Sequence, residues 1–226
     1  MSIVFVSSLL YAESMFDAVM ERIQNACDRA GRKRSEVKLV AVSKNHSVAE
    51  IEEQILSRGH RILGENRIQE WQAKALELAD VEWHFIGNLQ RNKVKYCLPF
   101  ELIHSVNSLR LIDELQRIGE SKDHVFKILL ELNVAGEVSK QGAALADLEQ
   151  LVDHARKQPN VALKGLMTMA PFSDDPEAAR PYFEKLHTIR DRLMLDELSM
   201  GMSGDFEVAI EEGATIIRVG SALFKA

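Results

Sequence analysis

The sequence predicts a single α/β domain, a (β/α)8 or TIM barrel with an extra helix at its N-terminus. Eight short apolar segments rich in β-branched residues occur along the chain, and helix-like segments separate them in strict alternation. The eight segments are apolar throughout, as strands are when helices cover both faces of a parallel sheet. Eight parallel strands within about 190 residues fit a closed barrel better than an open doubly wound sheet. We expect residues 1–226 to form this one domain.

Each element follows from its own pattern. The opening helix, residues 13–30, places Phe16, Val19 and Ile23 at three- and four-residue steps, and Gly31 ends it. The predicted strands are residues 37–43, 61–64, 81–87, 102–106, 126–134, 162–170, 198–203 and 215–220. The predicted helices between them are residues 48–57, 68–78, 91–96, 109–118, 145–157, 177–195 and 205–212.

The composition is that of an ordinary globular protein and excludes several classes of partner. Hydrophobic residues are 46% and charged residues 27% of the chain, which excludes disorder as its main state. The net charge is −6 and the basic cluster at residues 32–34 is short, so we expect no nucleic-acid partner. Cys27 and Cys97 lie far apart, without a CxxC pattern or a histidine at ligand spacing. This predicts two buried free thiols and no metal site.

The N-terminal segment does not resemble a secretory signal. Residues 3–10 are apolar, but the first basic residue is Arg22, whereas a signal carries a basic residue before its apolar run. The chain also has no stretch of the roughly 20 apolar residues that a membrane span needs. We therefore expect a cytoplasmic protein without a membrane partner. A compact barrel with no obvious extra apolar surface predicts a monomer.

A lysine follows the first predicted strand at the end where barrel enzymes place their chemistry. The strand ends on Ser43, and Lys44 comes next. An amine at the mouth of an apolar strand can lose its proton through desolvation and then attack an aldehyde to form a Schiff base. A lysine that only extends along the surface is the structural alternative.

The ends of the last two strands carry a pattern typical of anion binding. Arg218, Gly220 and Ser221 end the eighth strand with a cation, a close backbone approach and a hydroxyl, and Ser203 ends the seventh. The alternative is that Ser203 or Asp205 only caps the following helix. Because both loops show the pattern, a phosphate site is the favoured interpretation.

Other polar and soft side chains end the remaining strands. Asn66 and His84 either contact a cofactor ring or hold the barrel mouth together, and for His84 taken alone a buried structural imidazole is the favoured interpretation. Met200 and Met202 form either a soft apolar wall at the mouth or part of the core. A lysine and a phosphate site in one barrel mouth suit an aldehyde that also carries a phosphate, and pyridoxal 5'-phosphate is the common molecule of this kind.

Several motifs together resemble the pyridoxal phosphate homeostasis protein family. They occur in the family's order and spacing over residues 30–224. The motifs are residues 39–44 (LVAVSK), 64–70 (GENRIQE) and 83–87 (WHFIG) with Leu89, Gln90, Asn92 and Lys93, then Asn133 with Glu137, Lys140 and Gly142, then residues 165–167 (GLM), 198–203 (LSMGMS) and 218–221 (RVGS).

The resemblance implies a barrel similar to the N-terminal domain of bacterial alanine racemase, with the cofactor on Lys44. The residues that it implies as phosphate ligands are Ser203, Arg218, Gly220 and Ser221, with Asn66 and His84 near the ring. It further implies buffering or delivery of pyridoxal phosphate, to partners such as apo-enzymes that use it, and an influence on amino-acid and keto-acid balance, without established catalysis.

The chain departs from the family pattern at two places. Arg67 stands where some members carry Tyr, and residues 204–206 (GDF) stand where two acidic residues and Met are commoner. The first departure concerns a ring contact, and the second concerns the loop at the phosphate.

Two enzymatic alternatives remain open. A pyridoxal-phosphate enzyme such as an amino-acid racemase needs an acid/base partner opposite Lys44, and none of Tyr11, Tyr96 and Tyr182 falls at a predicted strand end. No carboxylate is clearly assigned to the ring nitrogen either. An aldolase-like barrel that forms a Schiff base with a sugar phosphate is the second alternative.

Overall fold

The computed structural model describes residues 14–137 and 141–224. The apolar segment at residues 3–10 and Lys140 therefore lie outside the described residues. The described residues form eight strands that close into a barrel in sequence order, and each neighbouring pair is parallel. The strands are β1 (Lys38–Val42), β2 (Ile62–Glu65), β3 (Glu82–Phe85), β4 (Leu102–Val106), β5 (Phe126–Glu131), β6 (Val161–Met167), β7 (Glu197–Ser199) and β8 (Ile216–Val219).

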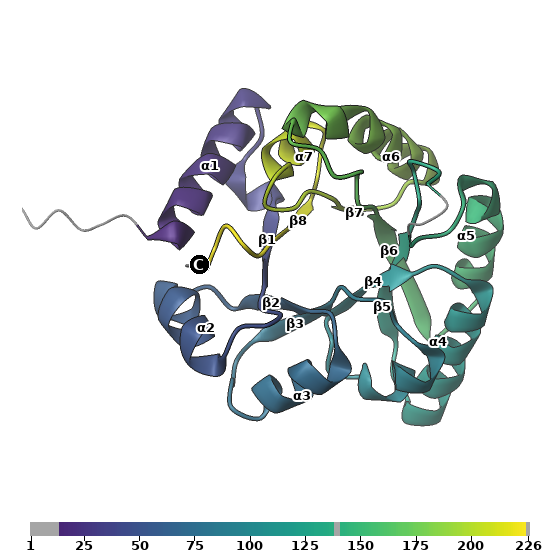
Figure 1. Cartoon of the computed structure of the whole chain (residues 1–226). Helices are drawn as coiled ribbons and strands as arrows, with labels where there is room; N and C mark the ends of the chain where they lie inside the picture. The colour runs from purple at the N-terminus through teal and green to yellow at the C-terminus, as the bar shows by residue number, and fades with distance from the viewer. Residues whose placement is uncertain (1–13, 138–140, 225–226) are drawn as a thin grey trace, which may run out of the picture.

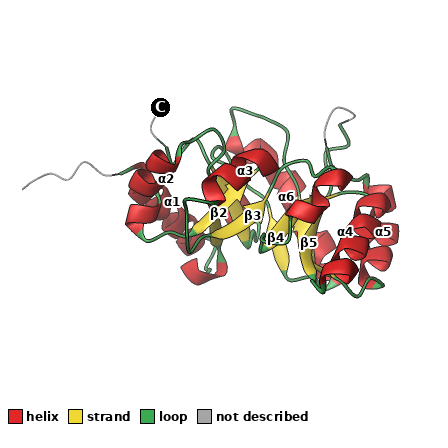
Figure 2. Cartoon of the chain, turned by 90° about the horizontal axis from the view of Figure 1, so that it is seen from below, coloured by secondary structure: helices red, strands yellow, loops and turns green. Residues whose placement is uncertain are grey.

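Helices surround the barrel (Figure 1), and a side view shows the strands between them (Figure 2). The α-helices are α1 (Met15–Arg29), α2 (Val48–Gln54), α3 (Ile68–Ala75), α4 (Leu109–Lys122), α5 (Leu148–Arg156), α6 (Arg180–Leu193) and α7 (Phe206–Glu211). Short 3-10 helices are η1 (Arg34–Glu36), η2 (Leu56–Arg58), η3 (Arg91–Tyr96), η4 (Leu145–Asp147) and η5 (Pro176–Ala179). The predicted (β/α)8 barrel with an extra N-terminal helix is confirmed.

The predicted elements match the observed ones except in type or length. The segment between β3 and β4 is a 3-10 helix rather than an α-helix. The prediction of a seventh strand through residue 203 is wrong, because β7 ends at Ser199. Gly201 turns the chain there with a φ of 90°, and a Cβ at this position would lie 2.5 Å from the Cβ of Ala209. The apolar residues after Ser199 therefore belong to a turn packed on α7.

The barrel interior is partly apolar and partly polar. Five buried side chains form a small apolar cluster inside it: Val40, Leu102, Leu129, Met167 and Ile216. The same interior holds buried polar side chains at neighbouring positions of β3, β4, β7 and β8, namely His84, His104, Ser199 and Arg218. The larger apolar core lies outside the barrel, between the strands and the helices. The barrel is therefore a packed core with a polar component that needs internal hydrogen-bond partners.

Candidate functional site

A cavity of about 760 Å³ opens at the carboxyl ends of the strands. It brings together several predicted site residues that are far apart in the sequence, namely Lys44, Asn66, Ser203, Arg218, Gly220 and Ser221. Its remaining wall includes the exposed Phe172 and Met202. The predicted convergence of a lysine, two serines and an arginine is therefore a feature of the structure.

Lys44 follows β1 by two residues and is exposed to the cavity. Among the described residues, its ammonium group has no hydrogen-bond or ion-pair partner. The backbone on each side of it is held by α3. Lys74 Nζ donates to the carbonyl oxygen of Ser43 at 2.7 Å, and the N–H of Asn45 donates to Glu70 Oε2 at 3.2 Å. The peptide is thus fixed while the amine stays available.

The contact of Lys74 with the end of β1 belongs to a buried cluster, which we call the Ser43–Glu65–Lys74 cluster. Lys74 Nζ donates to Glu65 Oε1 at 2.6 Å, and Ser43 Oγ donates to the same oxygen at 2.7 Å. Glu65 is fully buried and Lys74 is 7% exposed. The short bonds to Oε1 offset part of the desolvation of a charge pair at this depth, whereas the buried Oε2 of Glu65 has no hydrogen-bond partner within the described residues.

The loops after β7 and β8 meet at Ser203. Its Oγ accepts the backbone N–H groups of Gly220 at 3.2 Å and Ala222 at 3.3 Å. Because the oxygen accepts both bonds, the hydroxyl hydrogen is left to donate to a ligand. Ser221 is exposed beside it and makes no hydrogen bond within the described chain. These groups form a small donor surface suited to an anion.

The alternative in which Ser203 or Asp205 caps α7 does not match the structure. No side-chain cap bond is present at the start of α7, and Asp205 Oδ1 instead accepts the N–H of Met202 at 2.6 Å. Burial raises the pKa of Asp205, while the Met202 bond and the charge of Arg218 lower it. The carboxyl group holds the loop that carries Ser203, in the segment where the chain departs from the family pattern.

Arg218 lies deeper in the cavity than the Ser203 loop. It is 4% exposed, and its guanidinium donates from Nη1 to Ser199 Oγ at 2.6 Å and from Nη2 to the carbonyl oxygen of Thr168 at 3.0 Å. Burial lowers its pKa to about 10, and the nearby Asp205 and Glu131 carboxyl groups oppose that shift. The guanidinium is therefore a fixed positive charge at neutral pH. Arg218 lies within β8, whereas Gly220 follows the last residue of the strand, so the backbone of Arg218 is further from the rim than that of Gly220.

Asn66 brings an unused acceptor to the cavity. Its Oδ1 atom is buried and has no hydrogen-bond partner within the described residues. A Cβ at Gly87 would lie 2.1 Å from the carbonyl oxygen of Asn66, so only glycine permits this approach of the two loops. A buried acceptor without a donor is costly unless a ligand supplies the donor.

Two predicted cofactor contacts lie elsewhere. His84 is fully buried below the cavity, where its ring bonds Glu82 and His104, and it does not line the cavity wall. The position of His84 is therefore that of a buried structural imidazole. Met200 is fully buried in the outer core, and Met202 lines the cavity instead. Both residues lie close in sequence to the residues that do reach the cavity.

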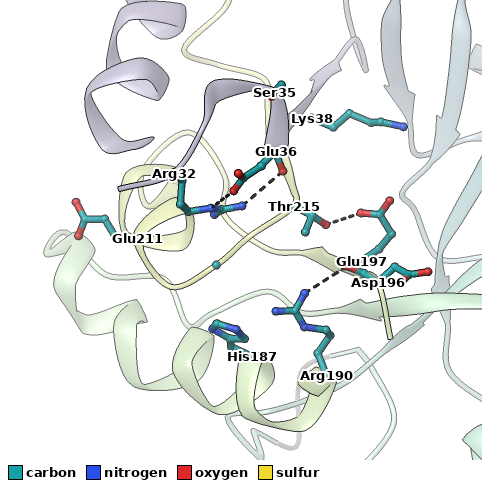
Figure 3. A pocket seen from close by; sticks show the side chains of 11 residues that line it. Arg32, Ser35, Glu36, Lys38, His187, Arg190, Asp196, Glu197, Glu211 and Thr215 are labelled. Carbon is teal, nitrogen blue, oxygen red and sulfur yellow. Dashed lines mark hydrogen bonds and ion pairs between the residues drawn. The ribbon is translucent and has the colours of Figure 1, made fainter. Parts of the chain in front are cut away.

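A second cavity, of about 580 Å³, opens at the opposite end of the barrel (Figure 3). Its charged groups are largely bonded to the protein. Arg32 Nη1 donates to the carbonyl oxygen of Ile210 at 2.7 Å, and Thr215 Oγ1 donates to Glu197. Lys38 at the start of β1 also lines it. Its lysine, Lys38, is paired with Glu82, so the described residues of this cavity offer no unpaired amine and the mouth cavity is the candidate site.

Three further findings concern chemistry away from the cavity. Cys27 and Cys97 are free and buried, as predicted, and burial raises the pKa of Cys97 to about 12. Over residues 14–137 and 141–224, no three His, Cys, Asp or Glu side chains are grouped so that they could hold a metal ion. Within the same ranges, no helix has the length and apolar character needed to cross a membrane.

Comparison with known proteins gives the same fold and closely related sequences. Residues 16–226 match the family model of the alanine racemase N-terminal domain. The chain is 47% identical over 215 residues to the pyridoxal phosphate homeostasis protein of Aquifex aeolicus, a match that covers 91% of this chain and 94% of the relative.

Two solved structures illustrate the structural similarity. PipY of Synechococcus elongatus, solved with pyridoxal phosphate bound, superposes with a TM-score of 0.79 at 37% identity, covering 92% of this chain and 100% of PipY. Alanine racemase of Clostridium difficile superposes with a TM-score of 0.69 at 11% identity, covering 90% of this chain and 55% of the racemase. The second similarity concerns the fold alone.

Proposed function

The chain belongs to the pyridoxal phosphate homeostasis protein family, within the alanine racemase N-terminal domain family, and we propose that it binds pyridoxal 5'-phosphate in the mouth cavity. The observation that carries the proposal is an unpaired lysine amine in the same cavity as an anion-donor surface, Lys44 with Ser203 and Ser221. The bound cofactor in the related PipY supports the choice of ligand.

The residues of the cavity suit the two ends of this cofactor. Pyridoxal phosphate supplies an aldehyde, which condenses with a primary amine as a C=N bond forms and water leaves. Lys44 provides that amine. Ser203 and Ser221 offer their hydroxyl hydrogens to the phosphate at the rim, beside Gly220, whose N–H is already donated to Ser203 Oγ.

The deeper residues suit the ring. Asn66 offers an unpaired Oδ1 acceptor to a ring substituent, and the fixed guanidinium of Arg218 lies at the inner wall, below the rim. This depth favours a contact of Arg218 with the ring side of the cofactor over the phosphate contact that the family resemblance implies. His84 and Met200 have no direct contact with the cofactor in this proposal, because neither lines the cavity.

We further propose a homeostatic role without catalytic turnover, in which the protein buffers pyridoxal phosphate, delivers it to apo-enzymes and so influences amino-acid and keto-acid balance. Neither Tyr96 nor Tyr182 lines the cavity, so neither is placed to exchange a proton opposite Lys44. The unit of this function is a single domain of residues 1–226, acting as a monomer in the cytoplasm. Its two buried free thiols suit a reducing compartment.

The cofactor site is tested on the purified protein. A visible absorbance spectrum, borohydride reduction and peptide mass mapping should locate a reduced phosphopyridoxyl group on Lys44. Lys44→Ala should abolish the adduct, whereas Lys185→Ala, which removes an exposed lysine on α6, should leave it unchanged. A protein that is colourless and takes up no added pyridoxal phosphate would overturn the proposal in favour of an aldolase-like barrel.

The absence of turnover is tested separately, by incubating the loaded protein with amino acids in deuterium oxide. We expect amino acids to exchange onto the cofactor without rapid deuterium incorporation at the α-carbon. Incorporation at rates typical of enzymes, about 1 s⁻¹ or faster, would instead establish a racemase-like activity.

A further inference from the structure

A row of hydrogen-bonded side chains crosses the barrel interior and ends at Arg218. We call it the polar row, and it consists of Lys38, Glu82, His84, His104, Ser199 and Arg218. We propose that the polar row positions Arg218 in the mouth cavity, with His104 as the acceptor that orients the Ser199 hydroxyl toward it. The consequence for cofactor binding rests on the proposed function, whereas the row itself does not.

The distances along the row are those of good hydrogen bonds. Ser199 Oγ lies 2.8 Å from His104 Nδ1, and His104 Nε2 lies 2.8 Å from His84 Nδ1. His84 Nε2 lies 2.8 Å from Glu82 Oε1, which also accepts from Lys38 Nζ at 3.2 Å. The members come from β1, β3, β4, β7 and β8, so the row joins strands on different sides of the barrel.

The acceptor end of the row, together with neutral histidine rings, determines the direction of its bonds. Glu82 has only acceptors, so His84 donates to it from Nε2–H. In a neutral ring, His84 Nδ1 carries no proton and accepts from His104 Nε2–H. In a neutral His104 ring, Nδ1 accepts the Ser199 hydrogen, while the Ser199 oxygen accepts from Arg218, which has only donors. Both histidines are Nε2–H tautomers in this arrangement.

The surroundings support neutral rings. His84 and His104 are fully buried, and burial lowers the pKa of both, most strongly for His104. The positive charge of Arg218 lowers the pKa of His104 further, while the bond to Glu82 opposes the shift at His84. A charged imidazolium inside the barrel would be poorly solvated and would repel the guanidinium.

The row gives Arg218 a fixed and fully buried acceptor, the Ser199 hydroxyl. Its Nη2 is anchored by the backbone oxygen of Thr168, but its Nη1 bonds a hydroxyl that can rotate. His104 removes that freedom, because its Nδ1 holds the Ser199 hydrogen and leaves the oxygen lone pairs for Arg218. The guanidinium is thereby pre-oriented toward the cavity before a ligand arrives.

The row is tested first in the protein without cofactor. Nitrogen-15 NMR of histidine-labelled protein at pH 7 reports the tautomer and charge of each ring. We expect both His84 and His104 to be neutral with the proton on Nε2. A proton on Nδ1 of either residue, or a charged ring, would overturn the proposed direction of the row whether or not the protein binds pyridoxal phosphate.

Two variants of His104 separate the two sides of its ring. Asparagine places an acceptor near the Nδ1 position and keeps the Ser199 bond, whereas glutamine places a donor near the Nε2 position and keeps the His84 bond. We expect His104→Gln to weaken pyridoxal phosphate binding about tenfold, the equivalent of one lost hydrogen bond, and to shift the absorption of the bound cofactor. His104→Asn should bind within about twofold of the unmodified protein.

Thermal unfolding of both variants and of the matched core variant Leu102→Val reports any general loss of stability. Equal binding by the two His104 variants would contradict the positioning role of the Ser199 bond. An unmodified protein that binds no pyridoxal phosphate would overturn the proposed function, and the tautomer measurement would then still decide on the row.

Discussion

Two buried polar groups flank the mouth cavity, and they are built in opposite ways. The Ser43–Glu65–Lys74 cluster lies between the barrel and α3, beside the backbone of Lys44, and it contains a complete ion pair. The polar row lies inside the barrel behind Arg218, and in our proposal its central histidines are neutral. The first group holds a backbone segment, and the second holds a side chain.

The difference follows from how well each of the two surroundings stabilises a buried charge. The ion pair of Glu65 and Lys74 has both charges within one hydrogen bond, with Ser43 as a further partner, so the attraction offsets much of the desolvation. In the barrel interior, the charges of Glu82 and Arg218 are separated by two imidazoles and a hydroxyl. Neutral polar groups cost less to bury than ions, provided that each one is bonded. The comparison predicts unequal responses to mutation.

The largest effect is expected from Lys74→Met, which leaves the fully buried carboxylate of Glu65 without its counter-ion. The free energy of unfolding should fall by about 3–5 kcal/mol, the usual cost of breaking a buried pair from one side. Urea unfolding measures it. The double variant Glu65→Gln with Lys74→Met should recover more than half of the loss, and a double variant as unstable as the single one would show that the charge is not the cause.

A smaller loss is expected from Ser199→Ala in the polar row. It removes a neutral hydroxyl that accepts from Arg218 and donates to His104, so the expected destabilisation is about 1–3 kcal/mol. Ser105→Ala is a matched control, because the Ser105 hydroxyl is equally buried but has no hydrogen-bond partner within the described residues. Similar losses in the two variants would contradict the contribution of the row.

The polar row should also make the free energy of unfolding depend on pH. The pKa of His84 and of His104 is lowered in the fold, so the unfolded chain takes up these protons first as the pH falls below the usual 6.5. Stability should therefore fall between pH 6.5 and 5.5, by up to about 1.4 kcal/mol per pH unit for each histidine. Burial also lowers the pKa of His60, which contributes to the same slope. His104→Asn should therefore reduce the slope by about a third, and an unchanged slope would contradict the assignment to the row.

Glu82 extends the same dependence to lower pH. The hydrogen bond from His84 and the charge of Lys38 lower its pKa to about 2 from the usual 4.5, so its contribution to stability is present above pH 4.5 and is lost as the pH falls toward 2. Because the Glu82 side chain is about one third exposed, screening reduces this contribution to about 1–2 kcal/mol. Acid unfolding of Glu82→Gln should therefore lack the steeper decline below pH 4.5.

Much of the fold and part of the site follow from the sequence, and the limit lies in side-chain direction. Strands that are apolar throughout predict a parallel barrel. Residues that directly follow the strands, such as Lys44 and Gly220, are then expected at its mouth, where the structure has them. His84 shows where this reasoning ends. Its side chain faces the barrel interior two residues before Ile86, which lines the cavity. The sequence alone does not show which inward-facing residue of a strand lies close enough to the rim to reach the cavity.

The two polar groups were beyond sequence reasoning for a different reason. The bond between His104 and Ser199 joins residues 95 positions apart, and Glu65 meets Lys74 only because α3 packs on the outside of β2. Neither pair has a spacing that marks it. A charged residue at the inner face of a predicted helix, as at Lys74, is the one available signal, because a buried charge requires a partner.

The smallest change in stability is expected from substitution of Glu70, and it distinguishes a residue that positions the Lys44 backbone from one that stabilises the fold. Glu70 Oε2 accepts the N–H of Asn45, whose φ of 64° is unfavourable for a residue other than glycine, while Oε1 pairs with the exposed Arg67. Glu70→Ala removes an exposed bond and should cost no more than about 0.5 kcal/mol of stability. It should nevertheless slow pyridoxal phosphate uptake at Lys44 about twofold in stopped-flow absorbance, because the loop that carries the amine loses its second anchor. Glu70→Gln keeps a carbonyl acceptor and should restore the rate. If the alanine and glutamine variants take up pyridoxal phosphate at the same rate, the backbone of Lys44 is held by the Ser43–Glu65–Lys74 cluster alone. Lys74 would then be the one residue of α3 that positions this backbone, in contrast to the polar row, which positions a side chain.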